Sequence, residues 1–164
     1  MEENIFFFLK NKKNTHYLYD NLSFPEALRI FRESGFTATP VIDYQGHYLG
    51  SVTEGDFLYY IADHPDTTRE EISDLELGSL IRDGFMPAVS FNVSMSELFN
   101  RSLEQNYVPV VDDRNIFIGI VTRKTIISYL MTKNHDHSFS QYEKMVQNKD
   151  NSASKDLHPI FTLR

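Results

Sequence analysis

Two short segments of the sequence carry residue types that could bind an anionic ligand. In the first, Thr53 and Asp56 follow a β-prone stretch and stand in the first turn of a predicted helix. A helix N-terminus presents unpaired N–H groups and the positive end of the helix dipole, both of which favour a phosphate. The threonine hydroxyl could donate to a phosphate oxygen, and the aspartate could accept from the two hydroxyls of a ribose. The same spacing is also typical of a helix capping box, so the two residues alone leave both interpretations open.

The second segment has the same position in its own predicted helix but a different charge. Thr122 is followed by Arg123 and Lys124, and Thr125 replaces the carboxylate. Adjacent cations in a first helical turn cost roughly a few tenths of a kcal/mol each, because the helix dipole repels them. Either both side chains point into solvent or they face an anion. The second interpretation predicts that Arg123→Ala weakens polyphosphate or dinucleotide binding more than adenosine binding.

The two segments resemble one another because the chain contains an internal repeat. Four landmarks recur at a constant separation of 69 positions. They are Pro40 with Pro109, Asp43 with Asp112, Gly50 with Gly119, and Thr53 with Thr122. Coincidence at one offset predicts two copies of one supersecondary unit.

Each copy is predicted to have the order β-α-β-β-α. In the first copy we expect strands at 15–19, 37–42 and 48–52, with helices at 23–35 and 53–64. In the second we expect strands at 88–91, 107–111 and 116–121, with helices at 94–104 and 122–131. A unit of roughly 60 residues is marginal by itself, so two copies should share a core. The predicted fold class is therefore α/β (α+β), with the two repeats in a pseudo-twofold arrangement.

The expected domain organisation follows from these units. Residues 1–64 hold the first repeat with an N-terminal segment, 65–86 a linker, and 87–132 the second repeat. Residues 133–164 are rich in Asn, Gln and Ser, which predicts a flexible tail. The apolar run Ile5–Leu9 is expected to pack against the repeats or a second subunit.

Composition narrows the function classes. The chain has 164 residues, no cysteine and a formal net charge of −7. An acidic balance disfavours general nucleic-acid binding, and no apolar run approaches the roughly 18 residues of a membrane span. No secretory signal pattern is present, so a cytoplasmic protein is expected. Neither a Gly-x-Ser-x-Gly elbow, a P-loop nor a convincing metal-ligand pattern occurs, and we predict no catalytic site and no metal site.

The repeated Pro-Val-Ile/Val-Asp strand and the Gly-x-Val-Thr-x-x-Asp segment resemble those of a tandem pair of cystathionine-β-synthase (CBS) domains, often called a Bateman module. The resemblance covers roughly residues 15–131. It implies two clefts between the sheets, flat homodimers, and adenine nucleotides such as AMP, ADP, ATP or S-adenosylmethionine as ligands. In some Gram-positive relatives the ligand is cyclic-di-AMP. The runs Gly35-Phe-Thr-Ala and Thr122-Arg-Lys resemble those of that subgroup.

The resemblance also implies roles for single residues. Thr53 and Asp56 match the phosphate-facing hydroxyl and the ribose-binding acid, and Thr122 matches the second hydroxyl. Thr125 departs from the acidic pattern, which places ordinary mononucleotide binding at that end in doubt. The remaining expected nucleotide-binding residues are His16 and Tyr17 on the opening strand, Thr37, Ala38, Tyr107 and Val108 at strand starts, and Arg123 and Lys124 near phosphate.

The expected function is that of a regulatory protein. It would bind an adenine nucleotide of the AMP, ADP or ATP type as a regulatory ligand between its repeats, without a catalytic cofactor. As a homodimer it would signal to an effector protein that the sequence does not identify. The alternatives are a cyclic-di-AMP receptor of the same fold and a ligand-free structural dimerisation module.

Overall fold

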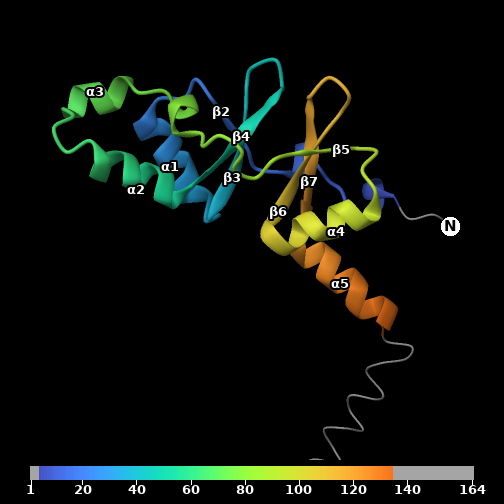
Figure 1. Cartoon of the computed structure of the whole chain (residues 1–164). Coiled ribbons are helices and arrows are strands. Elements are labelled where there is room, and N and C mark those ends of the chain that lie inside the picture. Colours follow the sequence, from blue (N-terminus) through green and yellow to red (C-terminus); the bar gives the residue numbers. More distant parts are fainter. Residues whose placement is uncertain (1–3, 135–164) are drawn as a thin grey trace, which may run out of the picture. The chain divides into compact units, whose positions relative to one another are not determined.

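The computed structural model describes residues 4–134 of the chain, in which the β-α-β-β-α order occurs twice (Figure 1). The first copy comprises β2 (Leu18–Tyr19), α1 (Phe24–Ser34), β3 (Ala38–Ile42), β4 (Tyr48–Thr53) and α2 (Glu54–Asp63). The second comprises β5 (Val89–Ser90), α4 (Met95–Glu104), β6 (Tyr107–Val111), β7 (Phe117–Thr122) and α5 (Arg123–Asn134). The predicted fold class is therefore confirmed.

Five further elements of the described chain lie outside the repeats. The short strand β1 (Lys10–Asn11) precedes the first copy, and α3 (Arg69–Asp74) and a 3-10 turn at Leu77–Leu80 form much of the connection. Two more 3-10 turns, Ile5–Phe7 and Lys12–Asn14, flank β1. The expected flexible tail comprised residues 133–164, of which 133–134 belong to α5 and the rest lie outside the described residues.

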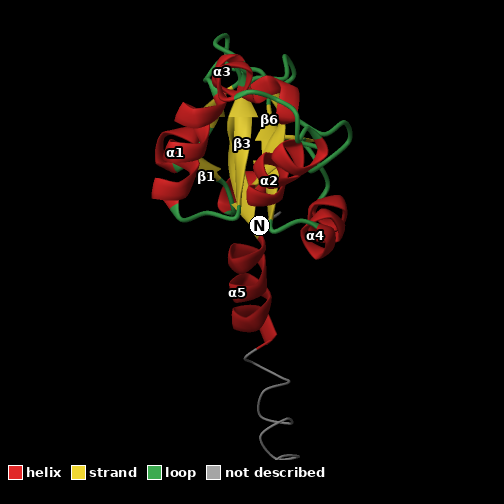
Figure 2. Cartoon of the chain, turned by 90° about the vertical axis from the view of Figure 1, so that its left-hand side faces the viewer, coloured by secondary structure: helices red, strands yellow, loops and turns green. Residues whose placement is uncertain are grey.

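The strands form two sheets, and Figure 2 shows the strands in yellow among the red helices. In the first sheet β3 pairs with β2 in parallel and with β4 in antiparallel orientation. In the second, β6 pairs in the same two ways with β5 and β7. The second sheet has one additional strand, because β1 pairs antiparallel with the outer edge of β7. The N-terminal segment therefore belongs to the sheet of the second repeat.

Helix boundaries follow from local chemistry, with one difference between the two copies. Gly35 ends α1 in the left-handed conformation, at φ 68°. In the second copy the hydroxyl oxygen of Ser94 accepts a hydrogen bond from the backbone N–H of Glu97, at 3.2 Å, as a capping residue should. Ser23 stands at the start of α1 with extended backbone but makes no side-chain capping bond. Of these two helices, only α4 therefore has a side-chain cap at its start.

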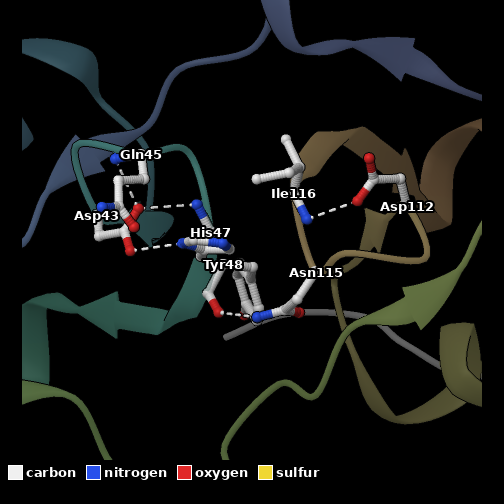
Figure 3. Close-up of polar contacts among 7 residues, drawn as sticks. All are labelled: Asp43, Gln45, His47, Tyr48, Asp112, Asn115 and Ile116. Atoms are coloured by element: carbon white, nitrogen blue, oxygen red, sulfur yellow. Dashed lines mark hydrogen bonds and ion pairs between the residues drawn. The ribbon is translucent and has the colours of Figure 1, made fainter.

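The two repeats are joined at the tips of their hairpins (Figure 3). The backbone N–H of Tyr48 donates to the carbonyl of Asn115 at 3.0 Å, and that of Phe117 donates to the carbonyl of Gly46 at 2.8 Å. Gly46 and Asn115, at equivalent repeat positions, both have positive φ, which glycine and asparagine tolerate best. The junction is thus symmetric with respect to the repeat.

An aspartate organises each hairpin. The carboxylate of Asp43 accepts from the backbone N–H groups of Gln45 and His47, and its other oxygen lies 2.7 Å from Nδ1 of His47. Partial burial opposes ionisation, but these hydrogen bonds outweigh it and lower the pKa of Asp43. In the second hairpin the carboxylate of Asp112 accepts in the same way, and its pKa is lowered as well.

Apolar clusters hold this part of the chain together. One lies between the first sheet and its helices, and its members include Leu18, Phe24, Phe31, Phe57 and Leu77. Another joins the two sheets and consists of Ile42, Tyr48, Met86, Tyr107, Val111, Phe117 and Ile120. The shared core that the size of each unit requires is therefore present.

The N-terminal apolar run is partly buried. Ile5 and Phe8 are buried, whereas Phe6 and Phe7 are exposed. The ring of Phe8 packs edge-on against that of Phe99, with 6.3 Å between centroids. The run therefore packs on the second repeat, which is one of the two placements expected from the sequence. Within residues 4–134, no helix has the length and apolar character that crossing a membrane would need.

Candidate nucleotide-binding cavity

A cavity of about 220 Å³ is lined by residues from both repeats and from the N-terminal strand. Its walls are formed by Lys10, Thr15, His16, Phe36, Thr37, Ala38, Pro40, Asn106, Tyr107, Ile120 and Thr122. These residues come mainly from the starts of β3 and β6 and the end of β7. All of them belong to the first of the chain's two compact units, which ends at Ile126.

The lining is mostly apolar, with polar groups at a few points. The rings of His16 and Phe36 lie 5.9 Å apart at one wall. Among the described residues that line the cavity none is acidic, and Lys10 is cationic. In a chain of net charge −7 this local balance favours an anionic or neutral ligand over a cation.

His16 is a neutral polar group at this cavity. Burial lowers the pKa of its imidazole, so the ring is uncharged at pH 7. Its Nδ1 atom is buried and has no hydrogen-bond partner in the described part of the chain. Buried polar atoms without partners are uncommon in folded proteins and often mark functional positions.

Lys10 reaches the cavity because β1 packs closely against β7. Lys10 and Asn11 pair with Ile120 and Gly119. A Cβ atom on Gly119 would collide with the backbone carbonyl of Lys10 and come within 3.1 Å of the Asn11 Cα. Gly119, at φ 154°, therefore permits this approach through both its missing side chain and its backbone conformation.

The structure brings together five of the eleven predicted binding residues. His16, Thr37, Ala38, Tyr107 and Thr122 line the cavity. The other six, Tyr17, Thr53, Asp56, Val108, Arg123 and Lys124, are not among its lining residues. Val108 is fully buried, and Tyr17 packs edge-on against Tyr19 and Phe117.

Thr53 and Asp56 interact with one another and with a residue of the connection. One carboxylate oxygen of Asp56 accepts from the backbone N–H and the hydroxyl of Thr53, both at 2.7 Å. The other lies 2.7 Å from Nε of Arg82. The Arg82 guanidinium also stacks on the ring of Phe85, 3.6 Å from its centroid. The carboxylate, which is 7% exposed, is therefore fully engaged within the chain.

Arg123 has partners that explain its place in a first helical turn. Its Nε atom donates to the carbonyls of Ser102 at 2.8 Å and Gln105 at 3.2 Å. Its Nη2 atom donates to the carbonyl of Leu103 at 3.3 Å. These carbonyls end α4, where the helix dipole favours a cation. Repulsion by the dipole of its own helix is thus offset by attraction to another. Lys124 is exposed.

Sequence reasoning missed Lys10, Thr15, Phe36, Pro40, Asn106 and Ile120. Asn106 could have been found, because it stands 69 positions after Thr37. Lys10 had no comparable signal, since its place depends on the pairing of β1 with a strand more than a hundred residues later. Among residues 4–134, no cluster of His, Asp and Glu is arranged to hold a metal ion.

Comparisons with known proteins agree with this architecture. A CBS domain protein from Streptococcus pneumoniae is 26% identical, with 79% of this chain and 87% of that chain covered and a TM-score of 0.72. CbpB in complex with c-di-AMP is 19% identical over 84% of this chain and 91% of that chain, with a TM-score of 0.76. CBSX2, a CBS-pair protein of Arabidopsis thaliana, is 22% identical in its complex with AMP. That comparison covers 82% of this chain and 100% of that chain, with a TM-score of 0.67. No curated protein matches the chain.

The family model of the CBS domain matches the chain twice, at residues 11–63 and 83–132. These two matches together cover more than half of the sequence and coincide with the two β-α-β-β-α units. The chain therefore belongs to the CBS domain family, and its two units are a tandem pair of CBS repeats.

Proposed function

We propose that this chain is a non-catalytic regulatory protein that binds an adenine nucleotide in the cavity between its CBS repeats. The observation that carries the proposal is the cavity itself, which both repeats line and in which Lys10 is the one charged residue among the described lining. Two structures of the same fold, those of CbpB and CBSX2, are complexes with c-di-AMP and AMP.

The size and lining of the cavity indicate which part of a nucleotide it would enclose. Its 220 Å³ is below the roughly 300–1,000 Å³ of sites that enclose a whole small molecule. A planar base would fit between its apolar walls and next to the rings of His16 and Phe36. Stacking of a base on an aromatic ring contributes about 1–3 kcal/mol. The phosphate would then extend toward the mouth, where Lys10 and the hydroxyl of Thr122 supply a charge and a hydrogen bond.

Both a mononucleotide and cyclic-di-AMP are compatible with a base-sized cavity that opens to solvent. The relation to CbpB in complex with c-di-AMP favours testing the dinucleotide beside AMP and ATP. Binding would regulate a partner if the ligand stabilises one of two arrangements that differ in affinity for the effector.

We also propose that the chain forms a homodimer through α2. Leu58, Tyr59 and Ile61 on this helix are 63%, 64% and 45% exposed, an unusual concentration of large apolar side chains. Sedimentation should show a dimer that Leu58→Asp with Tyr59→Asp converts to a monomer. A wild-type monomer at all accessible concentrations would exclude this part of the proposal.

Calorimetric titration with AMP, ATP, S-adenosylmethionine and cyclic-di-AMP tests the proposed ligand. Lys10→Gln should weaken binding of a phosphate-bearing ligand by about two- to fivefold, as expected for a solvent-exposed charge pair of ~0.5–1 kcal/mol, and leave adenosine binding unchanged. Lys13→Gln, an exposed lysine that does not line the cavity, is the matched control. Absence of binding by all four ligands would refute the proposal in favour of a structural dimerisation module.

A further inference from the structure

The internal repeat relates the cavity, the first place, to a second place that is formed by the equivalent residues, among them Ser51, Thr53 and Tyr107. Some of these residues differ in size from their counterparts in the cavity. Ala38 in the cavity wall corresponds to Tyr107, 69 positions later, and Ile120 corresponds to Ser51. The strand registers agree with this mapping, because Ala38 pairs with Thr53 as Tyr107 pairs with Thr122. Tyr107 lines the cavity as well, but its hydroxyl is directed to Ser51 at the second place, where Ala38 has only a methyl group to direct to Ile120.

The side chains at the second place are buried and bond to one another. The hydroxyl of Tyr107 lies 2.7 Å from that of Ser51, which lies 2.9 Å from the hydroxyl of Tyr48. Tyr48 in turn donates to the backbone carbonyl of Met86 at 2.7 Å. Since each hydroxyl has one proton, the order of donation is Tyr107 to Ser51, Ser51 to Tyr48, and Tyr48 to Met86.

This hydroxyl chain is excluded from solvent. Tyr107, Ser51 and Tyr48 are 7%, 1% and 9% exposed. Burial raises the pKa of both tyrosines above the usual range, so both are protonated donors at pH 7. Met86, the final acceptor, is also buried and has the left-handed φ of 51°. The fully satisfied chain holds this unusual backbone conformation in place.

The polar groups beside the hydroxyl chain are also engaged. Thr53 and Arg82 supply the hydrogen-bond donors of the Asp56 carboxylate, as described above, and the Arg82 guanidinium lies over Phe85. In the open cavity the residue equivalent to Thr53 is Thr122. Its hydroxyl contacts the hydroxyl of Thr125 at 2.8 Å, whereas that of Thr53 donates to a carboxylate. The first place is an open cavity with no acidic residue among its described lining. At the second place the polar side chains pair with one another.

We propose that the chain binds one nucleotide per subunit, in the cavity beside Ala38, because its own side chains occupy the equivalent second place. The inference rests on the proposed function and adds to it the stoichiometry and the position of the ligand. Tyr107 and the Arg82–Asp56 pair act as built-in substitutes for a second ligand.

The experiment that tests the inference is calorimetric titration of the full chain with AMP and with cyclic-di-AMP. Wild-type chain should bind one equivalent per subunit. Ala38→Tyr, which places in the open cavity the residue that the second repeat carries at the equivalent position, should weaken binding at least tenfold. Thr122→Val, which keeps the side-chain volume, should weaken it severalfold and guards against misfolding of the tyrosine variant. Ser51→Ala and Arg82→Gln, at two positions outside the cavity lining, should bind within twofold of wild type.

The outcomes separate the two proposals. If wild-type chain binds neither AMP nor cyclic-di-AMP, the proposed function fails, and this inference fails with it. If it binds but with a stoichiometry other than one, the inference alone is overturned. The inference alone is also overturned if Arg82→Gln or Ser51→Ala, shown to be folded by circular dichroism, loses binding while Ala38→Tyr retains it.

Discussion

The buried hydroxyl chain predicts unequal costs for two substitutions that each remove one oxygen. In Tyr107→Phe the first donor of the chain is lost, while Ser51 still donates to Tyr48 and Tyr48 to Met86. No buried donor is left without an acceptor, so the cost should be that of one hydrogen bond, about 1 kcal/mol of unfolding free energy.

Tyr48→Phe removes the middle of the same chain. The carbonyl of Met86 loses its donor, and the hydroxyl proton of Ser51 loses its acceptor. Rotation of Ser51 toward Tyr107 only moves the unsatisfied proton to the tyrosine. Each buried group left unsatisfied costs roughly 1–3 kcal/mol, so the expected loss from these two groups is about 2–6 kcal/mol.

Equilibrium urea denaturation followed by far-ultraviolet circular dichroism measures both losses, provided that the transition is two-state. The double variant should lose less than the sum of the two single losses, because the residues share one chain. Equal losses, or a larger loss for Tyr107→Phe, would refute the order of donation and the closure of the second place.

Three further perturbations test the remaining structural reasoning. In urea denaturation, Gly119→Ala should lower the unfolding free energy by about 3 kcal/mol or more, and Gly50→Ala by about 1–3 kcal/mol. Both variants strain a positive φ, but only the added methyl group at 119 collides with backbone, whereas that at 50 meets the movable side chain of Ile81. Equal losses would contradict this. The pKa of Asp43 is lowered in the folded chain, so its contribution to stability is present above its unfolded pKa of about 3.8 and is lost as pH falls through the folded value. Asp43→Asn should therefore flatten the acid side of the stability profile, and an unchanged profile would count against the hairpin hydrogen bonds. Arg123→Ala should lower the unfolding free energy by about 1–2 kcal/mol through loss of the α4 cap, whereas Lys124→Ala should change it by less than about 0.5 kcal/mol in the same assay.

Much of the fold could be predicted from local pattern. The separation of 69 positions between Pro40 and Pro109 identified two copies of one unit. The β-prone segments 37–42 and 48–52, with their copies at 107–111 and 116–121, predicted the hairpins that the structure contains. These features depend on neighbours within a few positions, which is the range over which turn chemistry and periodicity act.

The candidate site depended on contacts that no local pattern records. Lys10 joins the cavity through a strand pair with Ile120, and Arg123 turns to the carbonyls that end α4. Asp56 has the spacing of a binding residue, yet Arg82 from the connecting segment pairs with it. In each case the side chain's partner lies about twenty or more positions away.

The sequence by itself determined the repeat, its secondary structure and the family to which the chain belongs. Only the tertiary structure decided that a cavity opens beside Ala38 and that the hydroxyl of Tyr107 pairs with that of Ser51. The physical reason is that local spacing specifies which backbone elements form, whereas the direction of a side chain depends on the partners that folding brings to it.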